Sequence, residues 1–184
     1  MMINSILLFK LSMFLFIVGA LFSLILGFYS KKITIHASGY FGVISSFLSL
    51  ISSVSILLHH QSFSLTYQLP IPLVEKFQLA IDPLAAFFIL LISLLSIPVS
   101  IYSIGYLKSE YLNKNTGVLC SLFHLFILSL ILVVSINNSI VFLILWEVMT
   151  LLSFFFVISD IENDSSRHAG FIYLLMTHVG SAFY

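Results

Sequence analysis

Six long apolar runs dominate the sequence and restrict it to one kind of fold. A run of about 20 apolar residues can cross roughly 30 Å of hydrocarbon as an α-helix, which satisfies its own backbone hydrogen bonds in lipid. The runs cover about Leu11–Tyr29, Ser38–Leu58, Leu84–Leu107, Val118–Ile136, Ser139–Ser159 and Ala169–Tyr184. They predict an all-α, polytopic membrane helix bundle with about six transmembrane helices.

The scarcity of charged residues supports a lipid environment. Charged side chains make up 8% of the chain, against about a quarter in soluble domains, and 60% of the residues are hydrophobic. The basic and acidic residues balance, so charge gives no indication of a nucleic-acid partner. Cys120 is the only cysteine, which excludes an intrachain disulfide and a Cys-ligated iron–sulfur cluster. We therefore expect no cofactor and no redox chemistry in this chain.

The basic residues predict an orientation, because cytoplasmic loops of membrane proteins are enriched in Lys and Arg. The loops after the first, third and fifth apolar runs contain five of these residues: Lys31, Lys32, Lys108, Lys114 and Arg167. The loops on the opposite side contain only Lys76, and Lys10 stands at the start of the first run. This bias predicts a multi-pass protein of the cytoplasmic (inner) membrane with its N-terminus outside. The last run, Ala169–Tyr184, would extend only about 24 Å as a helix, so we expect it to be truncated.

The longest predicted loop, His59–Asp82, is on the outer side. Its middle part, Phe63–Leu69, alternates apolar and polar residues and predicts a short extended segment. Asp82 and Pro83 are typical of a helix start, and Pro98 is expected to kink the helix that follows. The adjacent His59 and His60 are weak evidence for a metal, because no third ligand accompanies them.

Three ionisable residues lie well inside predicted helices: Glu147, His178 and His124. A charged group at this depth is costly and usually functional. From the helix rise, His124 lies about 9 Å from the cytoplasmic face, His178 about 13 Å and Glu147 about 18 Å. If their helices pack together, the three groups form a stepwise path for protons. The hydroxyls of Thr150, Thr177 and Ser181 could line it, since they lie within one helical turn of Glu147 or His178.

Carboxylic acids in dry surroundings and imidazoles can both gain and lose protons near neutral pH. The alternative for each group is structural. Glu147 could join helices as an uncharged acid, and His124 and His178 could satisfy their nitrogens against a serine or a backbone carbonyl. The sequence contains no catalytic triad, phosphate-binding loop or nucleotide fingerprint, so the chain is expected to be a conduit or a scaffold.

Two segments resemble a known family. They are IDPLAAFFILLISLLSIPVSIYSIGYL, from Ile81 to Leu107, and NNSIVFLILWEVMTLLSFFFV, from Asn137 to Val157. Both are similar to the antiporter-like membrane subunits of complex I (NADH:quinone oxidoreductase) and of group 4 membrane-bound hydrogenases, especially hydrogenase-4 component B and the formate hydrogenlyase subunit. The resemblance divides the chain into residues 1–80, which agree only as hydrophobic helices, and residues 81–184, the start of an antiporter-like domain.

The resemblance implies that Glu147 is the family's essential fifth-helix glutamate, and that the chain belongs to a complex with other membrane and peripheral subunits. His178 and Ser181 stand where relatives often have an arginine and an aspartate, a departure that favours the hydrogenase branch. Relatives have about fourteen helices in inverted repeats and a lysine on the seventh. This sequence stops before such a helix, so the resemblance implies an N-terminal fragment.

The expected function is therefore proton translocation by a non-redox subunit of a hydrogenase or complex-I-like oxidoreductase. One alternative is a subunit of a multi-subunit sodium/proton antiporter. The other is a structural membrane subunit with no proton path of its own. The sequence does not distinguish protons from sodium ions, and it does not identify the electron donor or acceptor.

Overall fold

The computed structural model describes residues 2–60, 62–68, 76–110, 115–158 and 164–181. Six helices and two short strands make up these ranges. In chain order they are α1 Met2–Gly27, α2 Lys31–Leu58, β1 Phe63–Gln68, β2 Lys76–Ile81, α3 Pro83–Glu110, α4 Thr116–Ser135, α5 Ser139–Val157 and α6 Asp164–Ser181. The predicted polytopic helix bundle is confirmed.

Five of the described helices, α1 to α5, are long and apolar enough to cross a membrane. The sixth predicted helix is present as α6, but it begins at Asp164, five positions before the expected start, and its described residues do not meet the same standard. Its first turn contains polar residues that the prediction assigned to a loop. The protein is therefore a multi-pass membrane protein with five clear spanning helices and a sixth, more polar helix.

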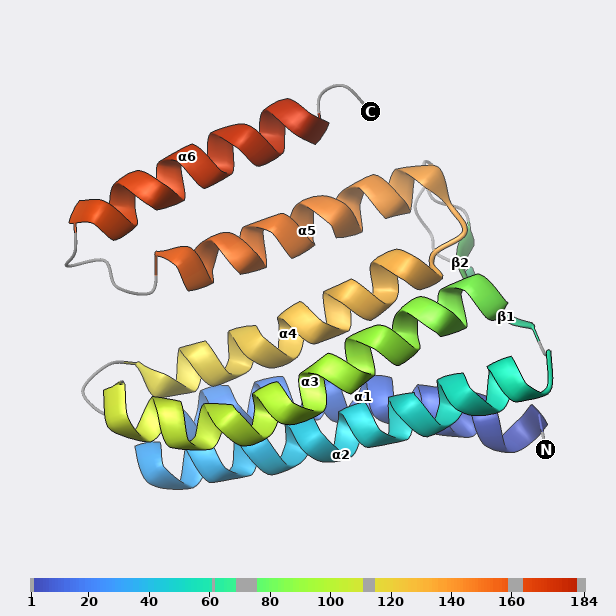
Figure 1. Ribbon diagram of the computed structural model, residues 1–184, viewed down its shortest axis with the longest axis horizontal. Coiled ribbons are helices and arrows are strands. Elements are labelled where there is room, and N and C mark those ends of the chain that lie inside the picture. Colours follow the sequence, from blue (N-terminus) through green and yellow to red (C-terminus); the bar gives the residue numbers. More distant parts are fainter. Residues whose placement is uncertain (1, 61, 69–75, 111–114, 159–163, 182–184) are drawn as a thin grey trace.

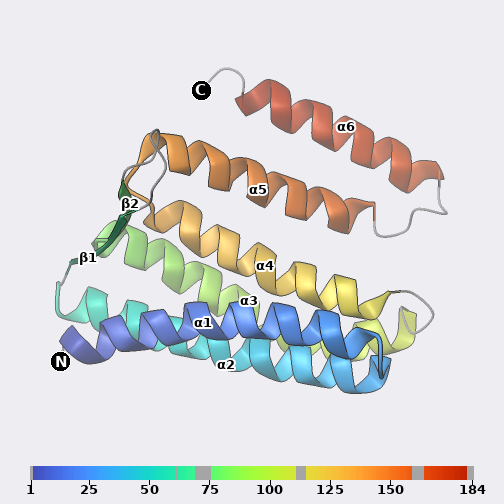
Figure 2. The ribbon, with the colours of Figure 1, turned by 180° about the vertical axis from the view of Figure 1, so that it is seen from behind.

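Successive helices run in opposite directions (Figure 1). The start of α1, the strands β1 and β2 and the α4–α5 connection lie at one end of the bundle, and the α1–α2 connection lies at the other, together with the ends of α3 and α5 and the starts of α4 and α6. The view from behind shows the same order, with α6 beside α5, α5 beside α4, and α1 to α3 beyond α4 (Figure 2). Lys31 and Lys108 are therefore at the same end, as the predicted orientation requires.

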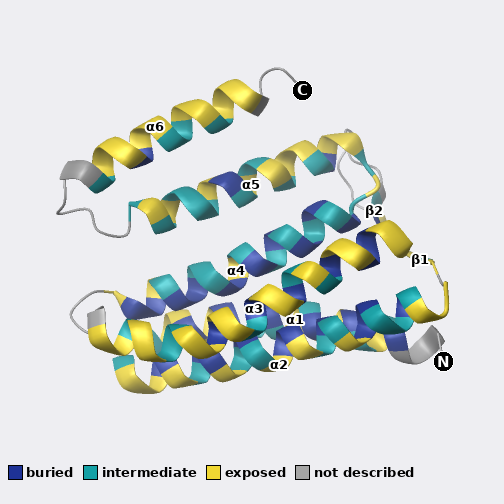
Figure 3. Ribbon diagram, viewed as in Figure 1, coloured by how far each residue is buried: buried dark blue, intermediate teal, exposed yellow. Residues whose placement is uncertain are grey.

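Helices α1 to α4 pack closely because small residues line their contacts. Buried residues recur every three or four positions along α2, at Ser38, Gly42, Ser45, Ser49 and Ser52. Small residues let helix backbones approach closely in lipid, where helix association gains little from the hydrophobic effect. The Ser96 hydroxyl of α3 donates to the Ser46 hydroxyl of α2 at 2.8 Å, which adds a hydrogen bond across the interface. Small polar residues thus form much of the bundle interior. The buried residues of α1 to α4 are the dark blue segments of Figure 3.

The outer loop contains a hairpin that the sequence reveals only in part. The predicted extended segment is confirmed as β1, except for Leu69, which lies outside the described residues. Its antiparallel partner β2, which pairs Phe63 with Ile81, was not predicted. The Gln78 carbonyl also accepts a hydrogen bond from the Asn137 amide at 2.9 Å, at the start of α5. The hairpin therefore connects the α2–α3 region to the α4–α5 junction.

Helices α3 and α5 each begin after a residue whose side chain caps the helix. The Asp82 carboxylate accepts a hydrogen bond from the Ala85 amide at 2.7 Å, which confirms the predicted cap of α3. The side chain of Asn138 caps α5 by accepting from the amides of Ile140 and Val141. Helix α3 continues through Pro98 without interruption, and the expected kink stays a prediction.

Candidate functional site

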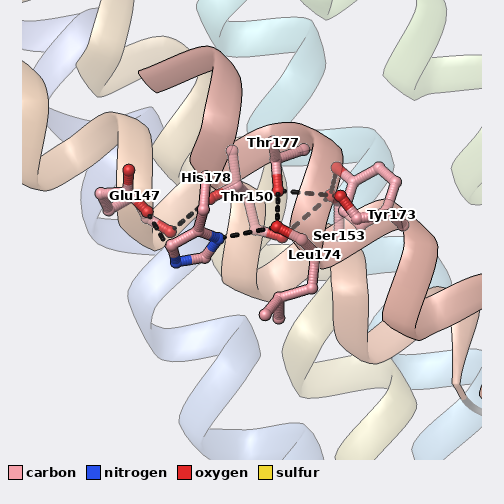
Figure 4. A network of polar contacts seen from close by, with 7 residues as sticks. All are labelled: Glu147, Thr150, Ser153, Tyr173, Leu174, Thr177 and His178. Carbon is pink, nitrogen blue, oxygen red and sulfur yellow. Dashed lines mark hydrogen bonds and ion pairs between the residues drawn. The ribbon is translucent and has the colours of Figure 1, made fainter. Parts of the chain in front are cut away.

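The structure brings two of the three predicted ionisable groups together. Glu147 lies in α5 and His178 in α6, and the Nε2 atom of His178 is 3.5 Å from the Oε2 atom of Glu147 (Figure 4). The Glu147 side chain is 37% exposed and that of His178 is 48% exposed, counting only this chain. The two groups therefore form a carboxylate–imidazole pair on one face of the α5–α6 contact, partly uncovered by the rest of the chain.

Hydroxyl groups follow the pair along the α5–α6 contact, as Figure 4 shows. Thr150 donates to the carbonyl of Glu147 at 2.8 Å, and Thr177 donates to the carbonyl of Tyr173 at 3.0 Å. The predicted lining residues Thr150 and Thr177 thus lie beside the pair, each bonded to its own helix. The side chain of Ser181, the third predicted lining residue, lies outside the described residues.

Two residues of this contact were missed from the sequence, Ser153 and Tyr173. Their hydroxyl groups form a direct hydrogen bond between α5 and α6. A signal exists for Ser153, because Glu147, Thr150 and Ser153 recur at three-residue intervals and so share one helix face. Together with the Glu147–His178 contact, these hydroxyls make the α5–α6 contact polar in a region of the chain that is otherwise apolar.

The third predicted group, His124, lies elsewhere. Its ring is completely buried, and its Nε2 atom is 3.1 Å from the hydroxyl of Ser38 in α2. Phe16 of α1 and Phe123 flank the ring, and a Cβ atom added to Gly19 would lie 2.9 Å from it. The described contacts of His124 are thus with α1, α2 and its own helix. They do not join His124 to the Glu147–His178 pair.

A groove lies between α5 and α6 beside the pair, with a volume of about 430 Å³. Apolar residues and two hydroxyls line it: Phe142, Leu143, Trp146, Thr150, Met176, Thr177 and Gly180. Within the described part of the chain, no group of three His, Cys, Asp or Glu side chains is placed to hold a metal ion. The local chemistry available here is proton exchange between a carboxylate and an imidazole.

Comparisons with known proteins agree with this arrangement of helices. The family described as NADH-ubiquinone oxidoreductase (complex I), chain 5 N-terminus, matches residues 73–115. Hydrogenase-4 component B of Escherichia coli is 36% identical over 103 residues, which are 56% of this chain and 15% of that protein. A Mycobacterium tuberculosis protein described only as uncharacterized is 33% identical over 100 residues, again 15% of its length.

A solved structure extends the likeness to nearly the whole chain. The membrane-bound sulfane sulfur reductase, an archaeal respiratory membrane complex, contains a chain that superposes with a TM-score of 0.74 at 17% identity. The match covers 95% of this chain and 35% of that one, and it shows the fold. The chain thus matches only a small part of the length of these relatives. Taken together, the matched sequence segments and the shared fold make this chain similar to the antiporter-like membrane subunits of complex I and group 4 membrane-bound hydrogenases.

Proposed function

We propose that this chain takes part in proton translocation as a non-redox component of a membrane-bound hydrogenase or complex-I-like assembly. The contact between Glu147 and His178 carries this proposal. The 3.5 Å separation of Oε2 and Nε2 joins two titratable groups from different helices. Neither group belongs to the closely packed interior of α1 to α4. Ionisable groups at membrane depth usually pair with one another and mark ion pathways.

The proton step involves only these two side chains and water. A protonated Glu147 can transfer its proton to the neutral imidazole, which gives a carboxylate and an imidazolium, and the reverse transfer restores the neutral pair. Water held in the groove beside the pair would bring a proton to one group and remove it from the other. Thr150 and Thr177 border the groove beside the pair and supply hydroxyls for that water.

The family suggests where the chain works. Its relatives include a hydrogenase component and a chain of a respiratory membrane complex. We propose that other membrane and peripheral subunits cover the outer faces of α5 and α6, and that the assembly lies in the cytoplasmic membrane. In the hydrophobic 18-residue stretch of α5, only 11% of the residues are buried within this chain, against 44% in the corresponding stretch of α4. Protein contacts on these faces would increase the electrostatic coupling of the pair by excluding water.

The test is a Glu147→Gln substitution in the intact assembly. The amide keeps the size of the side chain but cannot exchange a proton, so proton uptake into inverted membrane vesicles should be abolished while assembly remains normal. Asp82→Asn is the matched control, because it makes the same chemical change at a helix cap where asparagine serves equally well. This control should retain proton uptake.

Unchanged proton uptake with Glu147→Gln would refute the proposal. If uptake instead depends on sodium in the unmodified assembly, the chain acts as a sodium/proton antiporter component. Loss of the subunit from the purified assembly would indicate a structural role for Glu147.

A further inference from the structure

A shallow groove lies on the exposed surface of α3, near the end of the helix that carries Lys108. It has a volume of about 580 Å³ and is lined by Ile101, Tyr102, Gly105, Tyr106 and Ser109. These positions share one face of the helix, because they are neighbours or are three to four residues apart. The contact with α2 uses a different face, since Ser100 and Ile104 are the residues nearest to a Cβ atom added at Gly39 of α2. The groove therefore opens on a different side of α3 from α2.

The groove has an apolar floor and one flat aromatic wall. Gly105 forms the floor, since no described atom beyond its own helix backbone lies within 4 Å of a Cβ atom added there. The rings of Tyr102 and Tyr106 form the wall: their centroids are 5.7 Å apart and their planes differ by 21°. Ile101 is 58% exposed and adds aliphatic surface at the deeper end of the groove. These surfaces suit a slender apolar chain that lies along the helix.

A positive charge stands at the end of the groove nearer to water. Lys108 is exposed and lies three residues after Gly105 and seven after Ile101, so it shares their side of α3. Glu110 is two residues further, a spacing that places it on another face of the helix. The charge bias of the loops predicts that this end of the bundle, which also carries Lys31, is cytoplasmic (Figure 1). From the membrane interior outward, the groove therefore changes from apolar to basic.

We propose that this groove binds one anionic phospholipid. An acyl chain lies on Gly105 beside the rings of Tyr102 and Tyr106, and the phosphate lies beside the ammonium group of Lys108. The order of chemical groups along the groove matches that of a phospholipid, and tyrosine is enriched at this level of a membrane. Anionic phospholipids of the cytoplasmic leaflet attract basic residues that lie next to a membrane helix.

A transmembrane helix of another protein is the alternative occupant. It would cover the same floor, but it would have to bring an acidic residue to Lys108, whereas the phosphate of a lipid is at that level already. The Ser109 hydroxyl donates to the Tyr106 carbonyl at 3.0 Å, so Lys108 provides the charged contact that selects the headgroup. This inference does not depend on proton translocation, because neither Glu147 nor His178 lines the groove.

The first experiment identifies the occupant in the membranes of the expressing cell. The photoreactive residue p-benzoylphenylalanine replaces Tyr102 in one variant and Leu21 in a matched control. Leu21 is 57% exposed and lies six residues before the end of α1, much as Tyr102 lies eight residues before the end of α3. After irradiation, mass spectrometry of the intact chain should show mainly anionic phospholipid attached at position 102. Position 21 should yield phospholipids in proportion to their abundance.

Attachment of position 102 to another polypeptide would overturn the proposal, because a protein helix would then occupy the groove. The same distribution of phospholipids at both positions would also overturn it, since the groove would then hold only ordinary boundary lipid.

The second experiment tests the lysine with defined lipids. The chain with p-benzoylphenylalanine at position 102 is reconstituted into vesicles of equal parts phosphatidylglycerol and phosphatidylcholine. Lys108→Gln should lower the ratio of phosphatidylglycerol to phosphatidylcholine adducts about fivefold, the effect expected of one basic residue beside an anionic surface. Lys31→Gln removes the same charge from α2 at the same end of the bundle and should leave the ratio nearly unchanged. Equal losses in the two variants would mean that the basic end attracts anionic lipid in general, and would refute a site at Lys108.

Gly105→Leu tests the floor of the groove separately. Leucine fills the space above the helix backbone, so the yield of lipid adducts at position 102 should fall although Lys108 is still present. Circular dichroism checks that the helices are intact, as expected because a Cβ atom at this position meets no other part of the described chain. An unchanged yield would contradict the placement of the acyl chain on Gly105.

Discussion

The two histidines at membrane depth occupy opposite kinds of environment. His124 is completely buried among α1, α2 and α4, whereas the side chain of His178 is 48% exposed on α6. The helices also differ in burial: 44% of the hydrophobic stretch of α4 is buried within the chain, and 11% of that of α5. Helices α1 to α4 thus form a closed, closely packed bundle, and α5 and α6 form an open pair attached to one side of it (Figure 3).

This difference separates two uses of polar groups in a membrane protein. In α1 to α4, many serine hydroxyls bond to the carbonyl three or four residues earlier, which satisfies them within their own helix. In α5 and α6, two pairs of polar groups meet across the contact between the helices, at Glu147–His178 and Ser153–Tyr173, while Thr150 and Thr177 bond within their own helices. Substitutions should therefore affect stability most in the first region and exchange chemistry most in the second.

The largest effect on stability is expected for Gly117→Ala. A Cβ atom at this position would lie 2.6 Å from the Cα atom of Gly27, so the backbones of α1 and α4 would have to separate. We expect a loss of about 1 to 3 kcal/mol, typical of overpacking. Unfolding in mixed micelles, followed by circular dichroism, measures it.

Gly105→Ala is the control, because no atom lies within 4 Å of the added carbon. It should leave stability unchanged or raise it by less than about 1 kcal/mol through the higher helix propensity of alanine. Equal effects of the two substitutions would show that the α1–α4 contact is not as close as described.

Much of the fold follows from the sequence because lipid imposes a simple rule. Hydrophobic runs predicted all five clear spanning helices, since only a helix can satisfy the backbone there. The extension of α2 back to Lys31 was missed, because its first turns contain polar residues such as His36. The strand β2 was also missed, since the pairing of two short segments depends on contacts distant in sequence.

The site was predictable only in part. The cost of burying Glu147 identified it, and depth estimates put His178 near it. Depth alone could not place His124, because two residues at similar depth can face opposite sides of a helix bundle. The small residues that contact its ring, Gly19 and Ser38, lie on α1 and α2, and no sequence pattern connects them with a histidine on α4.

A smaller effect is expected for His124→Leu, which tests the closed region. Leucine fills similar space but leaves the Ser38 hydroxyl without its partner on α4. Hydrogen bonds between membrane helices contribute about 0.6 kcal/mol on average and at most about 1.7, so the loss should lie in that range. The matched variant His178→Leu, at an exposed position, should change the unfolding free energy by less than about 0.5 kcal/mol. A larger loss of unfolding free energy for His178→Leu than for His124→Leu would contradict the description of α1 to α4 as the closely packed region.

The smallest effect is expected for Tyr173→Phe, which removes one hydroxyl from the open pair. The substitution breaks the Ser153–Tyr173 hydrogen bond but keeps the ring, so α6 should lose about 0.6 kcal/mol of attachment to α5. Because this change amounts to a roughly threefold shift in a local opening equilibrium, hydrogen exchange should accelerate by that factor in α6 and remain constant in α1 to α4. Tyr102→Phe is the control, since Tyr102 is 68% exposed on α3 and stacks on Tyr106 through its ring. Acceleration throughout the chain would instead mean that α5 and α6 open together with the bundle, and that the two regions form one cooperative unit.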